Sequence, residues 1–150
     1  MPEGTNGSTG FRADLAGLLV VAMAAAYESC VKEVLIAHAS FRHGDFEYFV
    51  TQHYAKLNSK IGKDDLLRYA KLFSAKVHKD FKTLLKKRSD AIASRTGMDI
   101  AEKYGQILSW RHDYAHAGLQ NTTVSEAAKF HVFAKRVLYC FDEAFSGKIT

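Results

Sequence analysis

The sequence has one proline and two cysteines, and both shortages narrow the possible folds. Because the only proline is Pro2, no later residue is barred from a helix by a fixed φ angle or a missing backbone N–H. Cys30 and Cys140 are too few for a disulfide scaffold or a cysteine-based zinc site. Both lie in apolar helical patterns, so we expect buried, reduced thiols in a cytoplasmic protein.

The sequence also lacks a long hydrophobic run. The longest, LAGLLVVAMAAAY, covers residues 15–27, which is shorter than the roughly 20 residues that cross a bilayer. The residues before it are neutral and rich in Gly, Ser and Thr, whereas a signal peptide begins with a basic segment. Its helical pattern continues through Glu28 and Lys32. We therefore predict a core helix of a soluble protein that has no membrane partner.

No stretch alternates apolar and polar residues as a half-buried strand does, and no repeat or low-complexity block is present. Apolar residues instead recur at helical spacing. The expected helices cover residues 13–39, 45–57, a short segment after Gly62, 74–93, 99–117 and the segment from 123 onward. The sequence predicts one all-α bundle of about five or six helices over residues 12–150, after a flexible tail at residues 1–11.

Capping residues mark several of these helix ends. Asp64 and Asp99 each precede an apolar helical segment and are suited to cap its first turn. Thr123 and Glu126 have the spacing of a capping box. Gly118 follows the last residue of a helical pattern, where a glycine commonly ends a helix.

Positive charge is concentrated between residues 60 and 88. This segment holds ten Lys or Arg and three Asp, a net charge of +7, while the whole chain carries +5. Two sets of cations share a helical face: Arg68 with Lys71, and Lys79 with Lys82 and Lys86. Such a segment is either a solvated face or a track for the phosphates of RNA, and both interpretations stay open here.

The stretch RHDYAHAG, residues 111–118, concentrates groups that bind anions and transfer protons. Arg111 and His116 are five residues apart, so in a regular helix their side chains point roughly 140° apart at about 100° per residue. The two groups act together only if the helix end distorts near Gly118 or if a second copy of the chain completes the site. His112 lies one turn before His116 and shares its face.

The motif and its surroundings resemble the HEPN superfamily. The run RHDYAHAG is close to that family's R-N-x-x-A-H-G, in which an arginine is followed by a histidine after four intervening residues. The segments LVVAMAAAYESCVKEVLIAH, LNSKIGKDDLLRYAKLF, YGQILSWRHDYAHAG and TVSEAAKF resemble the helices of RiboL-PSP-type HEPN domains. The sequence departs from the motif at His112, which is usually Asn, and at Ala117, which displaces the glycine by one position.

The resemblance implies an endoribonuclease that needs no metal or other cofactor. RNA cleavage by its own 2′-hydroxyl requires a base, an acid and positive charge at the phosphate. Histidine is present in both proton states near neutrality, and arginine offers a planar fork to phosphate oxygens. We therefore expect Arg111 and His116 to be catalytic. HEPN ribonucleases are similar in placing two such motifs at the twofold axis of a homodimer, so a dimer around one RNA phosphate is implied.

Four further residues are candidates for supporting roles. His112 would orient RNA or His116, or carry a second proton. Tyr114 would stack on a base or merely pack, and Asp113 would hold a histidine tautomer or pair with Arg111. By analogy with the family, Glu28 would be a buried group that orients Arg111 or His116.

Less specific interpretations of these residues also exist. Cations at the end of a helix can simply complement its dipole. His112 and His116 have the spacing of metal ligands, but no convincing third ligand follows, so we expect no metal.

Three functions therefore compete. The first is the ribonuclease, acting by family analogy as a toxin or antiviral defence effector with an antitoxin or defence-system partner. The second is a catalytically inactive HEPN module that dimerises and binds RNA, a nucleotide or a regulatory partner. The third is an adaptor without affinity for nucleic acid. Intact RNA in a complex would distinguish the second, and no RNA binding at low salt the third.

Overall fold

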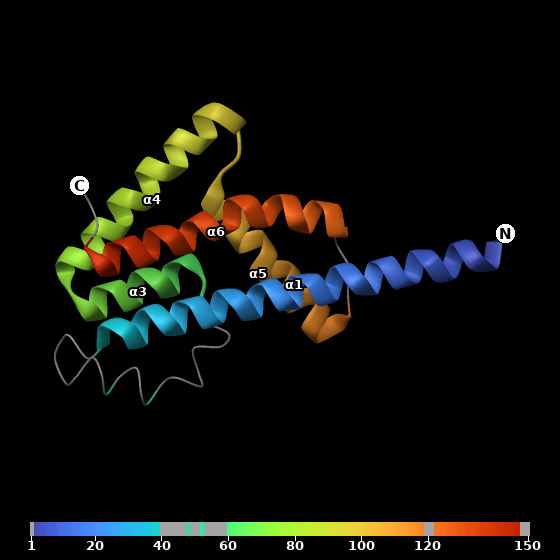
Figure 1. Ribbon diagram of the computed structural model, residues 1–150, viewed down its shortest axis with the longest axis horizontal. Helices are drawn as coiled ribbons and strands as arrows, with labels where there is room; N and C mark the ends of the chain where they lie inside the picture. The colour runs from blue at the N-terminus through green and yellow to red at the C-terminus, as the bar shows by residue number, and fades with distance from the viewer. Residues whose placement is uncertain (1, 40–47, 49–51, 53–59, 119–121, 148–150) are drawn as a thin grey trace.

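In the computed structural model of the protein, every element of the part that it describes is an α-helix (Figure 1). The structure describes residues 2–39, 48, 52, 60–118 and 122–147, and only the backbone for residues 2–13 and 39. The helices are α1 (Pro2–Ala39), α3 (Lys63–Phe73), α4 (Ala75–Thr96), α5 (Ile100–Ala117) and α6 (Val124–Ser146). The predicted all-α bundle of about five or six helices is confirmed.

The N-terminal helix is longer than the sequence predicted. α1 begins at Pro2, so the stretch predicted as a flexible tail, residues 1–11, is helical from its second residue. Glycine, serine and threonine lower helix propensity but do not stop a helix as an internal proline does, and a proline is tolerated in the first turn. The predicted helix over residues 45–57 lies outside the described residues except for Tyr48 and Gln52, which are helical.

The core lies where α1 packs on α5 and α6, while α3 packs on α4 and α4 packs on α6. In Figure 1, α6 runs beside α1 for much of its length. Val31, Leu35, Tyr104, Ile107 and Phe141 are fully buried in this core. Burial of each such side chain stabilises a fold by about 1.5–3 kcal/mol. The shared core therefore fixes α5 against α1.

α1 is also long and apolar enough to cross a membrane, by length and composition alone. The stretch Asp14–His38 has 25 residues, and a window of 18 residues within it has a mean hydropathy of 1.5, with 33% of that window buried. The prediction from the apolar run at 15–27 understated this length, because the helix stays apolar beyond Tyr27. In the fold, α1 packs on α5 and α6 with Val20 and Tyr27 buried, as a helix of the bundle does.

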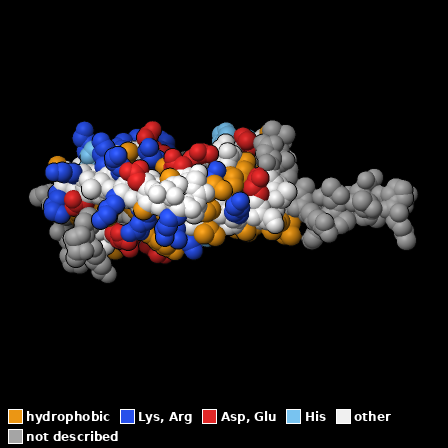
Figure 2. Space-filling model, turned by 90° about the horizontal axis from the view of Figure 1, so that it is seen from above, with side chains coloured by type: hydrophobic (Ala, Val, Ile, Leu, Met, Phe, Trp, Pro, Cys, Tyr) orange, Lys and Arg blue, Asp and Glu red, His pale blue; other side chains and the backbone are white. Residues whose placement is uncertain are grey.

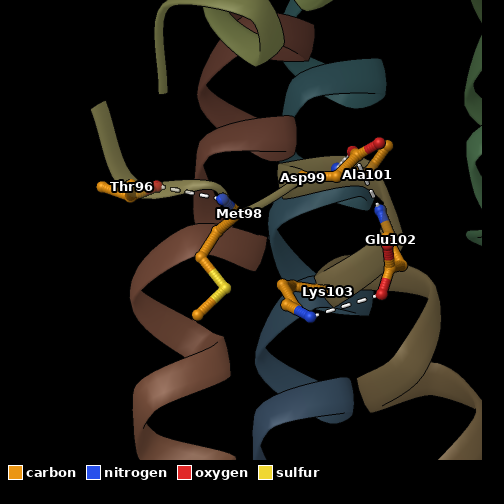
Figure 3. A network of polar contacts seen from close by, with 6 residues as sticks. All are labelled: Thr96, Met98, Asp99, Ala101, Glu102 and Lys103. Atoms are coloured by element: carbon orange, nitrogen blue, oxygen red, sulfur yellow. Dashed lines mark hydrogen bonds and ion pairs between the residues drawn. The ribbon is translucent and has the colours of Figure 1, made fainter. Parts of the chain in front are cut away.

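Helix α5, which carries the RHDYAHAG stretch, begins and ends at the predicted capping residues. The Asp99 carboxylate accepts hydrogen bonds from the backbone N–H groups of Ala101 and Glu102, at 2.9 and 3.2 Å (Figure 3). At the other end, Gly118 has a φ of +63°, and its N–H donates to the Tyr114 carbonyl at 3.0 Å. Both predictions are confirmed, and α5 continues as regular α-helix through its last residue.

The other helix ends give one partly correct and two wrong predictions. The Thr123 hydroxyl accepts from the Glu126 N–H at 3.1 Å, which is one half of the predicted capping box, while the Glu126 carboxylate accepts from the Thr122 hydroxyl at 2.9 Å. Asp64 is not the cap of α3, because Gly62 occupies that position and its N–H donates to the Asp65 carboxylate. The chain also does not continue as helix at residue 74. Ser74 is extended, and its hydroxyl caps α4 instead.

The two thiols are not joined to each other. Cys140 is buried, as predicted, and burial raises its pKa to about 11. Cys30 is only half-buried, and burial is the main cause that raises its pKa as well. Raised pKa values leave both groups as poorly reactive thiols near neutrality.

Candidate active site

The predicted catalytic residues line one cleft of about 610 Å³ between α5, α1 and the start of α3. The described residues of its lining are Glu28 from α1, Ile61, Gly62 and Asp65 at α3, and Gly105, Leu108, Ser109, Arg111, His112 and His116 from α5. The residues from α5 follow one another at helical spacing. Helix α5 thus supplies most of the ionisable side chains of the cleft, and α1 and the start of α3 form the opposite walls.

Arg111 is held at the α1 side of this cleft by Glu28. Its Nη2 donates to Glu28 Oε1 at 3.1 Å, with side chains that are 31% and 13% exposed, respectively. Burial raises the pKa of the Glu28 carboxyl, and the charges of Arg111 and Lys32 partly offset that rise. A guanidinium has five N–H donors, so Arg111 can still donate to an anion in the cleft while Glu28 holds it. This placement agrees with the orienting role expected for Glu28.

His112 and His116 form a close pair at the exposed end of the cleft. Their ring centroids are 4.3 Å apart and their planes are tilted by 48°. Both side chains are exposed to solvent. The expected common face is therefore present, and two imidazoles stand where one can accept a proton and the other can donate one.

Arg111 and His116 reach the same cleft although their positions on the helix diverge. Distortion of the helix end does not bring them together, because α5 is regular α-helix through Ala117. Arg111 instead reaches the cleft from its α1 wall, and His116 reaches it from the C-terminal end of α5. One chain therefore already lines a single cleft with both groups.

Tyr114 packs against α1 and does not line the cleft. A Cβ atom on Gly17 would lie 2.3 Å from Tyr114 Cε2, so the ring covers the buried glycine closely. Of the two roles left open for Tyr114, the structure favours packing over base stacking. Asp113 is half-buried and also lies outside the cleft lining. The sequence left open an ion pair of Asp113 with Arg111, and in the structure Glu28 forms an ion pair with Arg111.

The predicted phosphate track is only partly gathered by the fold. Lys82 and Lys86 line a hollow of about 400 Å³ between α3, α4 and α5, together with Lys63. Arg68 is instead paired with Asp65 at 3.3 Å. Figure 2 shows Lys and Arg side chains gathered mainly toward the end of the molecule where α3 and α4 meet.

Two residues of that track, Lys71 and Lys79, are exposed and do not line this hollow. An acidic hollow of about 540 Å³ lies between the lysine hollow and the cleft. It shares Gly62 and Asp65 with the cleft, and Lys63 and Asp99 with the lysine hollow. A strand that reached both basic regions by this route would pass carboxylates on the way.

The wall formed by residues 61 and 62 is anchored by two tyrosine hydroxyls. Tyr104 of α5 donates to the Ile61 carbonyl, and Tyr69 of α3 donates to the Lys60 carbonyl at 2.7 Å. Burial raises the pKa of both tyrosines, so both hydroxyls keep their protons near neutrality. Neutral donors therefore hold the backbone of this wall in place.

Sequence reasoning missed several residues of the cleft. Gly105, Leu108 and Ser109 precede His112 by seven, four and three residues, so helical periodicity alone places them on its face. Asp65 had no comparable signal, because only the packing of α3 brings it to α5. Within the described ranges, no group of three or more His, Cys, Asp or Glu has an arrangement that could hold a metal ion.

Comparison with protein families gives a match to RiboL-PSP-HEPN over residues 3–147, nearly the whole chain. No similar curated protein and no similar solved structure was found.

Proposed function

The chain belongs to the RiboL-PSP-HEPN family, and on that premise we propose that it is a metal-independent endoribonuclease whose active site is the cleft around Arg111 and His116. The observation that carries the proposal is the arrangement on its walls. A guanidinium oriented by a carboxylate lies in the same cleft as two imidazoles in contact. Few other arrangements of side chains supply fixed positive charge and two proton carriers together.

The proposed reaction is an attack of a ribose 2′-oxygen on the neighbouring phosphorus. A neutral imidazole takes the 2′ proton while the bond between the 2′-oxygen and phosphorus forms. The bond from phosphorus to the 5′-oxygen breaks, and an imidazolium protonates that leaving group. The products are a 2′,3′-cyclic phosphate and a 5′-hydroxyl. Arg111 stabilises the charge on the phosphorane oxygens, and His116 and His112 are the proton carriers.

We further propose that a homodimer completes the site. His116 and His112 are exposed at the end of α5, so a twofold axis near this end would bring two motifs to one phosphate. A twofold dimer is the commonest oligomer of soluble proteins. Within the same proposal, the protein acts in the cytoplasm as a toxin or antiviral effector that an antitoxin or another defence protein restrains.

The proposal is tested by incubating the purified protein with total RNA in the presence of EDTA and mapping the RNA ends. Cleavage should continue with chelator and leave 5′-hydroxyl ends. Arg111→Ala and His116→Ala should each reduce the rate at least about a hundredfold, as expected for loss of a charge-stabilising or proton-transferring group. Arg95→Ala and His78→Ala, both on α4 and outside the cleft lining, serve as controls.

Two results would reject the proposal. The first is cleavage by both cleft variants at the rate of the parent protein. The second is RNA that shifts in a gel but stays intact with every variant, which would favour the inactive RNA-binding module. The departures from the family motif at His112 and Ala117 are what keep this second function in consideration.

A further inference from the structure

Gly105 is a glycine that neither the backbone nor the packing of the described residues requires. It lies inside α5, where glycine destabilises a helix relative to alanine. Its φ is not in the left-handed region, unlike that of Gly118. A Cβ added to it would meet no atom of the described residues within 4 Å. Among the described residues, alanine would therefore fit at this position and strengthen the helix, so the reason for glycine lies outside the described packing.

The surroundings of Gly105 indicate what that reason is. It is exposed, and it lines the active-site cleft on the same helical face as Leu108, Ser109 and His112. A second glycine, Gly62, lines the cleft as well. Two wall positions without side chains leave the backbone open to close approach by a ligand, which is a recognised use of glycine in binding sites.

The position of Gly105 relative to the histidines separates this part of the cleft from the proposed chemistry. Gly105 precedes His112 by seven residues and His116 by eleven, which at 1.5 Å per residue is about 10 Å and about 16 Å along the helix. A group bound over Gly105 therefore flanks the scissile phosphate and does not replace it.

The lining of this region suits a nucleobase better than a phosphate. Leu108 and Ile61 offer apolar contact to a ring, and Ser109 offers a hydroxyl that donates and accepts. Asp65 places a negative charge here, which repels phosphate. Its two oxygens accept from the Gly62 N–H at 3.1 Å and from Arg68 at 3.3 Å. A carboxylate has about four acceptor positions, so Asp65 can accept a further hydrogen bond from a ligand.

We propose that the part of the cleft over Gly105 is a nucleobase subsite of the proposed ribonuclease, and that Asp65 selects cytosine and adenine, which carry their amino groups at C4 and C6. A carboxylate accepts from the amino group of cytosine or adenine, whereas the corresponding edge of uracil presents a carbonyl oxygen that also accepts. The subsite thus favours cytosine and adenine over uracil next to the cleavage point. Gly105 keeps the floor of the subsite free for the ring.

The test measures binding in the His116→Ala background, so that cleavage does not consume the probe. Fluorescent ten-nucleotide oligo(rC), oligo(rA) and oligo(rU) are titrated with this protein and with the same protein carrying Gly105→Leu. Oligo(rC) and oligo(rA) should bind more tightly than oligo(rU). Gly105→Leu should weaken their binding by about tenfold, because its side chain fills the space of the ring, and should remove the preference. Ala91→Leu, at an exposed position of α4, places the same leucine side chain outside the cleft and should change neither.

A second variant tests the role of the carboxylate. Asp65→Asn keeps an acceptor for the Gly62 N–H but adds an amide donor, so it should strengthen binding of oligo(rU) relative to oligo(rC). Equal binding of all three probes by the His116→Ala protein would overturn the subsite, and so would an unchanged preference in Gly105→Leu. Cleavage by the parent protein together with either result would reject the subsite and leave the ribonuclease standing. A base preference that depends on Gly105 in a protein that cuts no RNA would do the reverse.

Discussion

Two glycines inside helices, Gly17 of α1 and Gly105 of α5, should respond in opposite ways to replacement by alanine. Each substitution gains about 1 kcal/mol of helix propensity. At Gly105 the new methyl group meets no atom of the described part of the chain within 4 Å, so the whole gain should appear as stability. At Gly17 it would lie 2.3 and 2.4 Å from two ring carbons of Tyr114, where ordinary contact begins near 3.4 Å.

The size of the clash sets the expected difference. The Tyr114 ring would have to retreat by about 1.1 Å (3.4 − 2.3) from a buried contact between α1 and α5. Extra methyl groups forced into a packed core typically destabilise by about 1–3 kcal/mol. Because the propensity gain is common to both variants, Gly17→Ala should be less stable than Gly105→Ala by about 1–3 kcal/mol. For a chain of this size, that corresponds to melting temperatures roughly 2–12 °C apart.

Thermal unfolding followed by circular dichroism measures this difference directly. A third measurement isolates the cause, since Gly17→Ala made in a Tyr114→Ala background should no longer destabilise. Equal increases in melting temperature for Gly17→Ala and Gly105→Ala would refute the reasoning. A destabilising Gly17→Ala that persists without the Tyr114 ring would show that the contact is not its cause.

Three further predictions concern charge and protonation. Burial raises the pKa of Glu28, so ionisation of this carboxyl lowers the stability of the fold as the pH rises from about 4.5. Glu28→Gln should flatten that part of the profile of stability against pH. It should also slow cleavage, because Arg111 loses its ionic partner. Burial is the main cause that lowers the pKa of His131, so the unfolded state binds the proton of this histidine more tightly than the folded state does. The stability of the fold should therefore fall as the pH drops below about 6.5. His131→Phe should reduce the difference between the melting temperatures at about pH 7.5 and about pH 5.5. Lys82→Ala combined with Lys86→Ala should weaken RNA binding and reduce the slope of log K against log salt by about 1.4, if each lysine contacts one phosphate of a single strand.

Each of these predictions has a matched control or a contrary result. Gln52→Ala alters an exposed amide that carries no charge, so it should change neither the pH profile nor the cleavage rate, unlike Glu28→Gln. An unchanged pH dependence in His131→Phe would contradict the assignment to that histidine. Lys87→Ala removes an exposed lysine of α4 that does not line the hollow, and a loss of salt dependence as large as that of the double variant would disprove a specific role for the hollow.

Features set by neighbours in the sequence were predicted well. Asp99, Thr123 and Gly118 act on backbone groups within a few residues, so their side chains and position in the pattern were sufficient. The prediction that Asp64 caps α3 was wrong, because the Gly62 N–H donates to the Asp65 carboxylate there, and this interaction is equally local in the sequence. The prediction of a flexible tail before the helix was wrong, because composition describes average helix propensity and not the extension of a helix that is already formed, which here begins at Pro2.

Features set by tertiary packing were not accessible to local patterns. The ion pair of Arg111 with Glu28 joins residues 83 positions apart, and only the resemblance to a known family suggested it. The contact of Gly17 with Tyr114 and the presence of Asp65 in the cleft depend on how α1 and α3 lie against α5. No periodicity in one helix encodes the position of another.

The tyrosine bonds to the carbonyl groups of Lys60 and Ile61 have a mechanical consequence. One of those tyrosines, Tyr104, belongs to α5, which also forms the facing side of the cleft. A displacement of α5 therefore moves the two facing sides of the cleft together. Such a movement changes the direction in which the cleft opens more than it changes the width of the opening. We expect substrate to enter a slot whose shape exists in advance, so that association with RNA follows a single kinetic phase without a slower step of closing.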